Sequence, residues 1–323
     1  MINKALILFL VVLSACKQQA ATSYVPDSSG NINAVTVVMP KADWQGELGK
    51  KIRKRFQEPY EGLPYDEPKF DLKFIPSSAF SGFAKQGRNI LWFVKDSISD
   101  FSISQNFFAQ PQIVGIFRAP DPETQAFFWE ENSSLLERYF VGQERDEKNR
   151  RIQKSLANES TLEKRFGLKL SYPSAYKTVK DTTNFIWIEK PTAKGHNNIL
   201  VYSLPLSAFD YKQPERILDI RDSIGKLYVP GRLPNTHLIS ERAYLPYYYA
   251  EKWEDRKVQI TKATWEVAND FMAGPYVHMI VPDPKNDRWI CMEGFAFAPN
   301  NPKRPAMFEL ETILRSVQWT NGN

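Results

Sequence analysis

Cys16 is the residue whose position in the sequence implies the most definite chemistry. It directly follows Leu13-Ser-Ala, and the apolar run from Ala5 to Leu13 follows Lys4. A basic start, an apolar run of this length and small residues before a cleavage point are typical of a secretory signal, and the run is too short to span a bilayer. In this lipobox pattern the cysteine thiol receives a diacylglyceryl group once the signal, residues 1–15, is removed. The sequence therefore predicts lipidation at Cys16 and a membrane anchor.

The segment at residues 16–32 is polar and rich in serine, which predicts a flexible tether behind the lipidated cysteine. Lys17, rather than an aspartate, follows the cysteine, so an inner-membrane retention signal is not evident and the outer membrane is favoured. The acidic cluster that marks surface export in some Gram-negative groups is also missing. Whether the protein faces the periplasm or the cell surface stays open.

Beyond this cysteine, the residue types used in catalysis are few and scattered. The histidines His196, His237 and His278 lie far apart in the sequence. His278 falls in an expected strand, where a packed imidazole is favoured over a catalytic base. Cys291 also falls in an expected strand and is interpreted as a buried thiol rather than a nucleophile.

The motifs of common cofactor and metal sites are absent from the sequence. It has no glycine-rich phosphate loop, no His-Glu-x-x-His, no Gly-x-Ser-x-Gly and no cysteine pair. Asp283, Asn286 and Asp287 lack the alternating pattern of a calcium loop, so an ordinary turn is expected there. We expect no cofactor and no metal site, and the sequence favours a protein without enzymatic activity.

Glu293 is the carboxylate that stands out, because it lies on an otherwise apolar strand. It is near Arg288 in sequence, and we expect a structural ion pair with that residue or with Lys303 or Arg304. The alternative is a hydrolase that acts on an envelope polymer, peptidoglycan or glycan, through carboxylates such as Glu293 or Asp270. That alternative requires a cleft with two carboxylates about 5 to 10 Å apart.

An aromatic stretch in the second half is a candidate binding surface. It is flanked by the cations Arg242 and Lys252 and consists of Tyr244, Tyr247, Tyr248, Tyr249 and Trp253. Aromatic side chains with a polar tip are typical of interfaces and of sugar-binding faces. A glycan-binding surface lipoprotein is therefore a second alternative, and it predicts exposed, coplanar rings. A strand that packs some of the rings inward would explain the same residues.

The composition indicates a folded protein and excludes one class of partner. The chain has 323 residues, of which 42% are hydrophobic and 13% aromatic, and its net charge is +5. About 300 residues suffice for two domains. Nucleic-acid binding requires a basic stripe with a larger excess of positive charge, so no nucleic-acid partner is expected. With Cys16 acylated, only Cys291 remains, and no intramolecular disulfide is possible.

Two α+β domains are expected, at residues 33–160 and 161–323, each a mainly antiparallel sheet with helices on one face. In the first, the patterns predict strands at 34–39, 70–75, 89–95 and 112–118 and helices at 46–56 and 123–140. The charged segment 144–154 continues or follows the second of these helices and is interpreted as a solvated helix face. In the second, they predict strands at 168–172, 185–187, 199–203, 257–267, 276–281 and 289–298 and helices from 214 and from 305. Both halves close with strand, Ala-Pro, turn and helix, so an internal duplication stays open.

From Arg221 onward the chain resembles a family of Bacteroidota-type envelope lipoproteins that is classed as a domain of unknown function. The residues that carry the resemblance include Arg221, Asp222, Trp265, Asp270, Gly274, Pro275, Glu293, Gly294, Lys303, Arg304 and Glu311. Family members tend to have Arg-Gly and Gly-Gly where this chain has Lys262-Ala263 and Ala273-Gly274. The resemblance implies an envelope location and this fold, but it assigns no catalytic residue.

From Phe166 onward the layout is also similar to that of the PsbP group, whose members bind proteins. Taken together, the sequence predicts a membrane-anchored envelope lipoprotein of unknown molecular activity. We expect a non-enzymatic binding or accessory subunit of an outer-membrane complex. Its partners would be the membrane, through the lipid anchor, and an envelope protein, with a glycan as the alternative.

Overall fold

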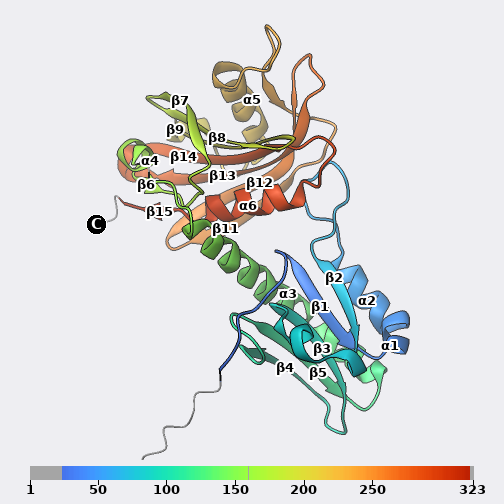
Figure 1. Cartoon of the computed structure of the whole chain (residues 1–323). Helices are drawn as coiled ribbons and strands as arrows, with labels where there is room; N and C mark the ends of the chain where they lie inside the picture. Colours follow the sequence, from blue (N-terminus) through green and yellow to red (C-terminus); the bar gives the residue numbers. More distant parts are fainter. Residues whose placement is uncertain (1–23, 159, 321–323) are drawn as a thin grey trace, which may run out of the picture.

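The computed structural model describes residues 24–158 and 160–320. The signal expected at residues 1–15 and the lipidation expected at Cys16 lie outside the described residues. The described chain forms two large sheets, and the long helix α3 (Pro122–Gln153) runs from one toward the other (Figure 1). The expected α+β class is confirmed. Within residues 24–158 and 160–320, no helix is long and apolar enough to cross a membrane.

The sheet of the N-terminal half has the strand order β2-β1-β3-β5-β4 among the described residues. Its strands are β1 (Ala34–Met39), β2 (Asp71–Pro76), β3 (Asn89–Lys95), β4 (Asp100–Gln105) and β5 (Ile113–Ala119). Only β4 and β5 pair antiparallel, whereas the other pairs are parallel. The expectation of a mainly antiparallel sheet is therefore wrong for this half. Continuous apolar runs such as that of β1 are typical of parallel strands with both faces covered.

Helices cover one face of this sheet. They are α1 (Lys41–Gln45), α2 (Glu47–Phe56) and α3, and their aromatic side chains Phe56, Trp129 and Phe140 pack together over the strands. On the other face, the segment with the 3-10 turns η1 (Ser77–Ala79) and η2 (Gly82–Gln86) supplies Phe80 and Ala84 to a smaller apolar cluster.

Helix α3 begins within one residue of its expected start and extends beyond residue 140 as one continuous helix, which is one of the two possibilities that the sequence left open. Asp121 accepts a hydrogen bond from the backbone N of Thr124 at 2.7 Å, and Pro122 occupies the first turn. The helix continues through the charged segment, where Glu144 and Glu147 are buried. The interpretation of residues 144–154 as a solvated face is therefore wrong for these two carboxylates, which have arginine partners inside the protein.

The end of the expected tether is bound to the N-terminal half. The backbone N of Gln110 donates to Pro26 O at 2.9 Å, and Ser28 N donates to Gln110 O at 2.9 Å. Ser29 N donates to Gln86 O at 2.8 Å. The expectation of a free tether through residue 32 is wrong from about Pro26 onward, because these backbone groups are paired.

The C-terminal sheet is antiparallel, as expected. Its strands are β7 (Lys177–Thr182), β8 (Phe185–Thr192), β9 (Gly195–Pro205), β10 (Leu238–Ser240), β11 (Tyr247–Trp253), β12 (Arg256–Val267), β13 (Ala273–Asp283) and β14 (Arg288–Phe297). Their order is β10-β12-β13-β14-β9-β8-β7, with β11 also paired to β12. The short strands β6 (Leu168–Lys169) and β15 (Gln318–Trp319) pair separately. The two large sheets differ in strand direction, which does not support an internal duplication.

Helices lie on both faces of the C-terminal sheet, not on one as expected. α6 (Arg304–Arg315) packs on the face that carries Ile199 and Val201, whereas α5 (Arg216–Tyr228) packs on the face that carries Leu200 and Tyr202. Figure 1 shows the sheet between these two helices. The remaining elements are α4 (Thr161–Phe166), η3 (Leu206–Ala208) and η4 (Pro284–Asn286). Both faces are apolar because successive residues of a strand point to opposite sides.

Candidate functional site

A buried ion pair lies between α5 and the C-terminal sheet. Arg221 Nε is 3.0 and 2.9 Å from the two carboxylate oxygens of Glu293, and Nη2 is 2.8 Å from Oε1. Both side chains are almost fully buried. Arg221 also donates to Ser240 Oγ at 3.3 Å, and its guanidinium lies 3.9 Å from the centre of the Tyr276 ring. The expected structural ion pair exists, but its partner is Arg221 and not Arg288, Lys303 or Arg304.

The groups around this pair are neutral and enclosed. Tyr202 and His278 share a hydrogen bond of 2.9 Å between the hydroxyl and Nε2. Burial, together with the charge of Arg221, lowers the pKa of His278 to about 3. Burial also raises the pKa of the Cys291 thiol well above its ordinary value. Burial also raises the pKa of Glu293, and the facing guanidinium of Arg221 opposes that rise. These groups therefore form a packed core rather than a reactive centre.

Asp222 anchors the middle of the same helix to a neighbouring strand. Its Oδ1 accepts from the backbone N of Ser240 at 2.6 Å, and its Oδ2 accepts from Arg242 Nη2 at 2.5 Å. The two residues that open the family resemblance therefore fix α5 to the sheet, Arg221 through β14 and Asp222 through β10.

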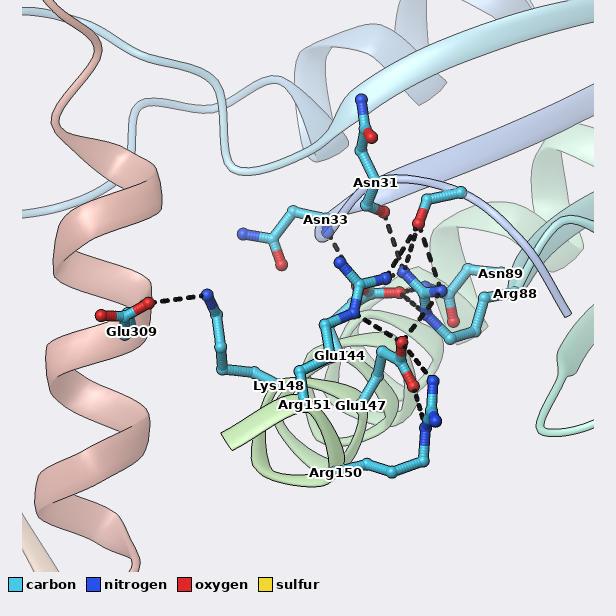
Figure 2. Close-up of polar contacts among 11 residues, drawn as sticks. Asn31, Asn33, Arg88, Asn89, Glu144, Glu147, Lys148, Arg150, Arg151 and Glu309 are labelled. Carbon is cyan, nitrogen blue, oxygen red and sulfur yellow. Dashed lines mark hydrogen bonds and ion pairs between the residues drawn. The ribbon is translucent and has the colours of Figure 1, made fainter. Parts of the chain in front are cut away.

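A second buried cluster lies in the N-terminal half and is shown in Figure 2. Arg88 Nε and Nη2 donate to the two oxygens of Glu144 at 2.9 and 3.0 Å. Glu144 also accepts from Asn89 Nδ2 at 2.5 Å and from the backbone N of Asn33 at 2.8 Å. Arg88 in turn donates to Asn31 O at 2.8 Å. The cluster holds the chain entering β1 against the C-terminal half of α3.

Glu147 extends this cluster to the surface. It accepts hydrogen bonds from Arg150 and from Arg151, each at 2.7 Å to the guanidinium Nε, and Arg88 Nη1 lies 3.9 Å away. Burial acts to raise the pKa of Glu147, but these arginines outweigh it and lower the pKa to about 2. Arg151 also donates to Gly30 O at 3.1 Å.

Open space is found on the α5 face of the C-terminal sheet, beyond the end of that helix. A cavity of about 220 Å³, the aromatic pocket, is lined by Trp187, Glu189, His196, Val229, Pro230, Gly231, Arg232, Leu238, Trp265, Val267, Met272 and Phe295. Trp265 and Phe295 meet edge to face at 5.5 Å. Most of the lining is aromatic or aliphatic, which suits an apolar group.

The rim of the aromatic pocket consists of the lining residues Arg232 and Met272 with their neighbours in the chain, and it combines an ion pair with exposed apolar side chains. Arg232 donates to both oxygens of Asp270, at 2.7 and 2.8 Å, and this hydrogen bonding lowers the pKa of Asp270. Phe271, next in the chain, is fully exposed, and Leu233 is 49% exposed. Both carboxylate oxygens of Asp270 are therefore paired with Arg232, and the side chains of Phe271 and Leu233 beside this pair face solvent.

Gly274 and Pro275 lie at the start of β13, where it meets Trp265 and Thr264 of β12. A Cβ on Gly274 would lie 2.1 Å from Ala296 O in β14, so the close approach of β13 to β14 requires glycine here. Gly294 similarly admits α6, because its Cβ would lie 2.8 Å from Leu310 Cβ. The position that holds Ala273 in this chain is exposed and tolerates a side chain.

Lys303, Arg304 and Glu311 contact the N-terminal half instead of the pocket. The backbone N atoms of Lys303 and Arg304 donate to the two oxygens of Glu67 at 2.6 and 2.8 Å, and Arg304 Nη2 lies 2.6 Å from Asp71 Oδ2. These contacts join the first turn of α6 to the loop before β2.

Glu311 is the centre of this connection. Its oxygens accept from Tyr60 at 3.0 Å and Arg145 at 3.0 Å, and from Lys262 at 2.8 Å and Arg315 at 2.9 Å. Burial opposes ionisation, but the three cations hold the pKa of Glu311 far below its ordinary value. Since Tyr60 and Arg145 belong to the N-terminal half, this carboxylate joins the halves. Glu309 does the same through Lys148 at 3.1 Å (Figure 2).

The aromatic stretch does not form one surface. Tyr244 and Tyr248 pack against the core on the α5 side, whereas Tyr249 and Trp253 pack against the core on the α6 side. Tyr247 is 42% exposed. Because β11 is a strand, its side chains alternate between faces. The coplanar, exposed rings that a glycan-binding surface requires are not what these residues form.

Two features were missed at the level of sequence. The first is the Arg88, Glu144 and Glu147 cluster, for which a signal existed, because both glutamates continue the helical spacing of Trp129, Leu136 and Phe140. The second is the aromatic pocket, whose lining comes from separate strands and loops. No local pattern marks such a set, because the fold brings its members together.

The chain matches two families of unassigned activity. Residues 154–316, half of the chain, match the domain of unknown function DUF4837, and residues 28–153 match the domain of unknown function DUF8532. No curated protein matches the chain.

Two of the solved structures to which the chain is similar show a distant likeness. The Ran-binding protein Mog1p of Saccharomyces cerevisiae is 10% identical, with a TM-score of 0.31, over 48% of this chain and 90% of Mog1p. LpqN, involved in cell envelope biogenesis of Mycobacterium tuberculosis, is 11% identical, with a TM-score of 0.30, over 47% of this chain and 82% of LpqN. At such identities and scores, what these proteins bind or do is not transferred to this chain.

Proposed function

We propose that this chain, which belongs to the DUF4837 family of domains of unknown function, is a lipid-anchored envelope protein that binds another protein rather than catalysing a reaction. The observation that carries the proposal is the aromatic pocket with Phe271 and Leu233 exposed beside it. A cavity of about 220 Å³ accommodates one or two apolar side chains of a partner. The PsbP-like layout expected from Phe166 onward points to the same kind of role.

The chemistry of the rim favours a protein partner. Exposed apolar side chains next to an apolar cavity are typical of protein interfaces, in which a central anchor is surrounded by a polar rim. Here Phe271 and Met272 supply the apolar surface, and the ion pair of Arg232 with Asp270 supplies the polar edge. A partner segment that inserts an aromatic or aliphatic side chain fits this arrangement.

The alternatives have less support. The hydrolase alternative depends on Glu293 or Asp270, but Glu293 is fully buried against Arg221 and Asp270 is held by both nitrogens of Arg232 that face it. The glycan alternative depends on the aromatic stretch, which divides between two faces of the sheet.

Site-specific photo-crosslinking tests the pocket. A photoreactive amino acid at position 271, in the full chain in its native envelope, is expected to give one dominant adduct with another protein. Val179 is the matched control, because it is 52% exposed on the strand at the opposite sheet edge. Met272→Lys, which places a charge at the pocket mouth, should abolish the adduct without changing the melting temperature. Adducts of equal yield at positions 179 and 271, or an adduct that survives Met272→Lys, would sink the proposal.

The anchor, and an outer-membrane location, are part of the same proposal. Residues from Pro26 onward are bound to the N-terminal half, and ten peptide units separate Pro26 from Cys16. Such a length spans at most about 36 Å, so lipidation would hold the N-terminal half close to the membrane. Labelled palmitate is expected to enter the wild-type protein and not Cys16→Ser. Fractionation should recover the wild-type protein in the outer membrane. Label in the serine variant would overturn the anchor.

A further inference from the structure

One flank of α3 borders an open groove, the α3 groove. Its volume is about 360 Å³, and it runs between the helix and the ends of β4 and β5, where Gln105 and Ile113 lie. The helix contributes apolar surface, because Leu135 is 38% and Tyr139 is 41% exposed. These side chains belong to a helix whose other face is part of the core, so the groove leaves an apolar strip in contact with solvent.

Gly142 lies in this strip, in the interior of a 32-residue helix. A glycine there is unfavourable relative to alanine, because it loses more backbone freedom on folding. A Cβ at this position would meet nothing within 4 Å, so packing inside the chain does not require a glycine. A small residue on an open helix face lets another backbone approach closely.

The charges beside Gly142 are arranged symmetrically about it. Arg138 lies four residues before it and Asp146 four residues after it, and both are exposed and line the groove. Neither side chain has an ion-pair partner among residues 24–158 and 160–320. Positions 138, 142 and 146 form a single i±4 ridge on the helix, the type of ridge that interdigitates when two helices cross.

We propose that the α3 groove binds the α3 helix of a second copy of this chain, antiparallel and crossing at Gly142. A two-fold axis through Gly142 places Arg138 of each copy opposite Asp146 of the other, so both unpaired charges gain a partner. It also covers Leu135 and Tyr139 in each copy. The charge pattern is complementary to itself, which is the requirement for an isologous interface. This pairing uses the N-terminal half and is independent of the aromatic pocket.

Cysteine crosslinking tests the position of the axis. In the full chain in its native membrane, mild oxidation of Gly142→Cys is expected to give a disulfide-linked dimer, because residue 142 of each copy faces residue 142 of the other. Phe127→Cys, 60% exposed on the same helix but outside the groove, is the control and should stay monomeric. Cys291 is buried and does not compete. No dimer at 142, equal dimer at 127, or a disulfide to a different protein would each overturn the proposal.

Charge reversal tests the pairing itself. The detergent-solubilised wild-type protein is expected to sediment as a dimer, and Arg138→Asp or Asp146→Arg alone to weaken dimerisation at least tenfold. The double variant restores opposite charges across the axis and should dimerise as the wild type does. Both positions are exposed, and a circular dichroism melt checks that each variant is folded. A monomeric wild type, single variants that still dimerise, or a folded double variant that does not, would contradict the proposed contact.

Discussion

Glu144 and Glu293 are both buried carboxylates paired with an arginine, but they differ in the donors that surround them. Glu144 accepts from Arg88 twice, from Asn89 and from the backbone of Asn33. Within residues 24–158 and 160–320, Glu293 accepts from Arg221 alone. In addition, Arg88 has backbone carbonyls as acceptors, whereas the other contacts of Arg221 are a serine hydroxyl and a tyrosine ring.

The difference has a structural basis. The first pair lies where the chain entering β1 crosses α3, so backbone groups are close enough to complete the network. The second pair lies inside an aromatic core between α5 and the sheet, where backbone groups are already paired in strands. A buried charge whose partner is removed therefore has substitutes in the N-terminal half and few in the C-terminal half.

The largest effect is expected from Glu293→Gln, which should lower the free energy of unfolding by about 3 to 5 kcal/mol. Arg221 would remain charged and buried without a carboxylate. Urea denaturation followed by tryptophan fluorescence measures the loss. The matched control is the double variant Arg221→Met with Glu293→Leu, which removes both charges and should regain most of the stability. A single variant as stable as the wild type would show that the pair does not stabilise this half.

Glu144→Gln should have a smaller effect, a loss of about 2 to 3 kcal/mol, since the carbonyl of Asn31 and the carboxylate of Glu147 remain near Arg88. It should also release the chain before β1, so that the amides of Ser28 and Ser29 exchange hydrogen faster. Mass spectrometry of exchanged peptides measures this release. A loss equal to that of Glu293→Gln would remove the distinction between the two pairs.

Lowering the pH should remove the stability contributions of the two clusters in different pH ranges. The folded pKa of His278 is about 3, below its ordinary 6.5, so between these values the unfolded chain binds a proton that the folded chain does not. Stability therefore falls as the pH is lowered from 6.5 toward 3, by about 2 kcal/mol at pH 5. The pKa of Glu147 is lowered from 4.5 to about 2, so its contribution is present above pH 4.5 and is lost only below it.

The measurement is urea denaturation at pH 7 and pH 5. His278→Gln should remove most of the difference between the two pH values, whereas Glu147→Gln, the matched control, should leave it unchanged. The opposite pattern would assign the acid sensitivity of this range to the N-terminal cluster.

The smallest effect is expected from Arg151→Ala, about 0.5 to 1 kcal/mol, because this side chain is 42% exposed and solvent screens its pair with Glu147. Arg150→Ala should behave alike, since its side chain is 54% exposed. Thermal unfolding in low and high salt measures the stability loss of both variants. The difference in stability between the wild type and each variant should be smaller in high salt. A loss above about 2 kcal/mol would place these surface arginines among the contacts that hold the cluster together.

Local patterns in the sequence predicted much of the secondary structure. The β-branched run at 34–39 is a strand, the helix expected from 123 starts at Pro122, and the strands expected at 185–187 and 199–203 lie within β8 and β9. These features depend on residues near one another in the chain, through capping, side-chain period and backbone preference. The sequence did not predict the parallel direction of β1, β2 and β3, because direction depends on how α2 and the following loop return the chain.

The site also has features that local sequence predicted and features that only the tertiary structure determined. The sequence singled out Glu293 as a carboxylate needing a cation, because an acid on an apolar strand is costly unless it is paired. The partner, Arg221, is 72 residues away in the chain and was decided by the packing of α5 on the sheet. The aromatic pocket also depends on tertiary packing, since its walls come from five strands and two loops. Local chemistry states what a side chain requires, and only the tertiary fold determines which distant residue meets that requirement.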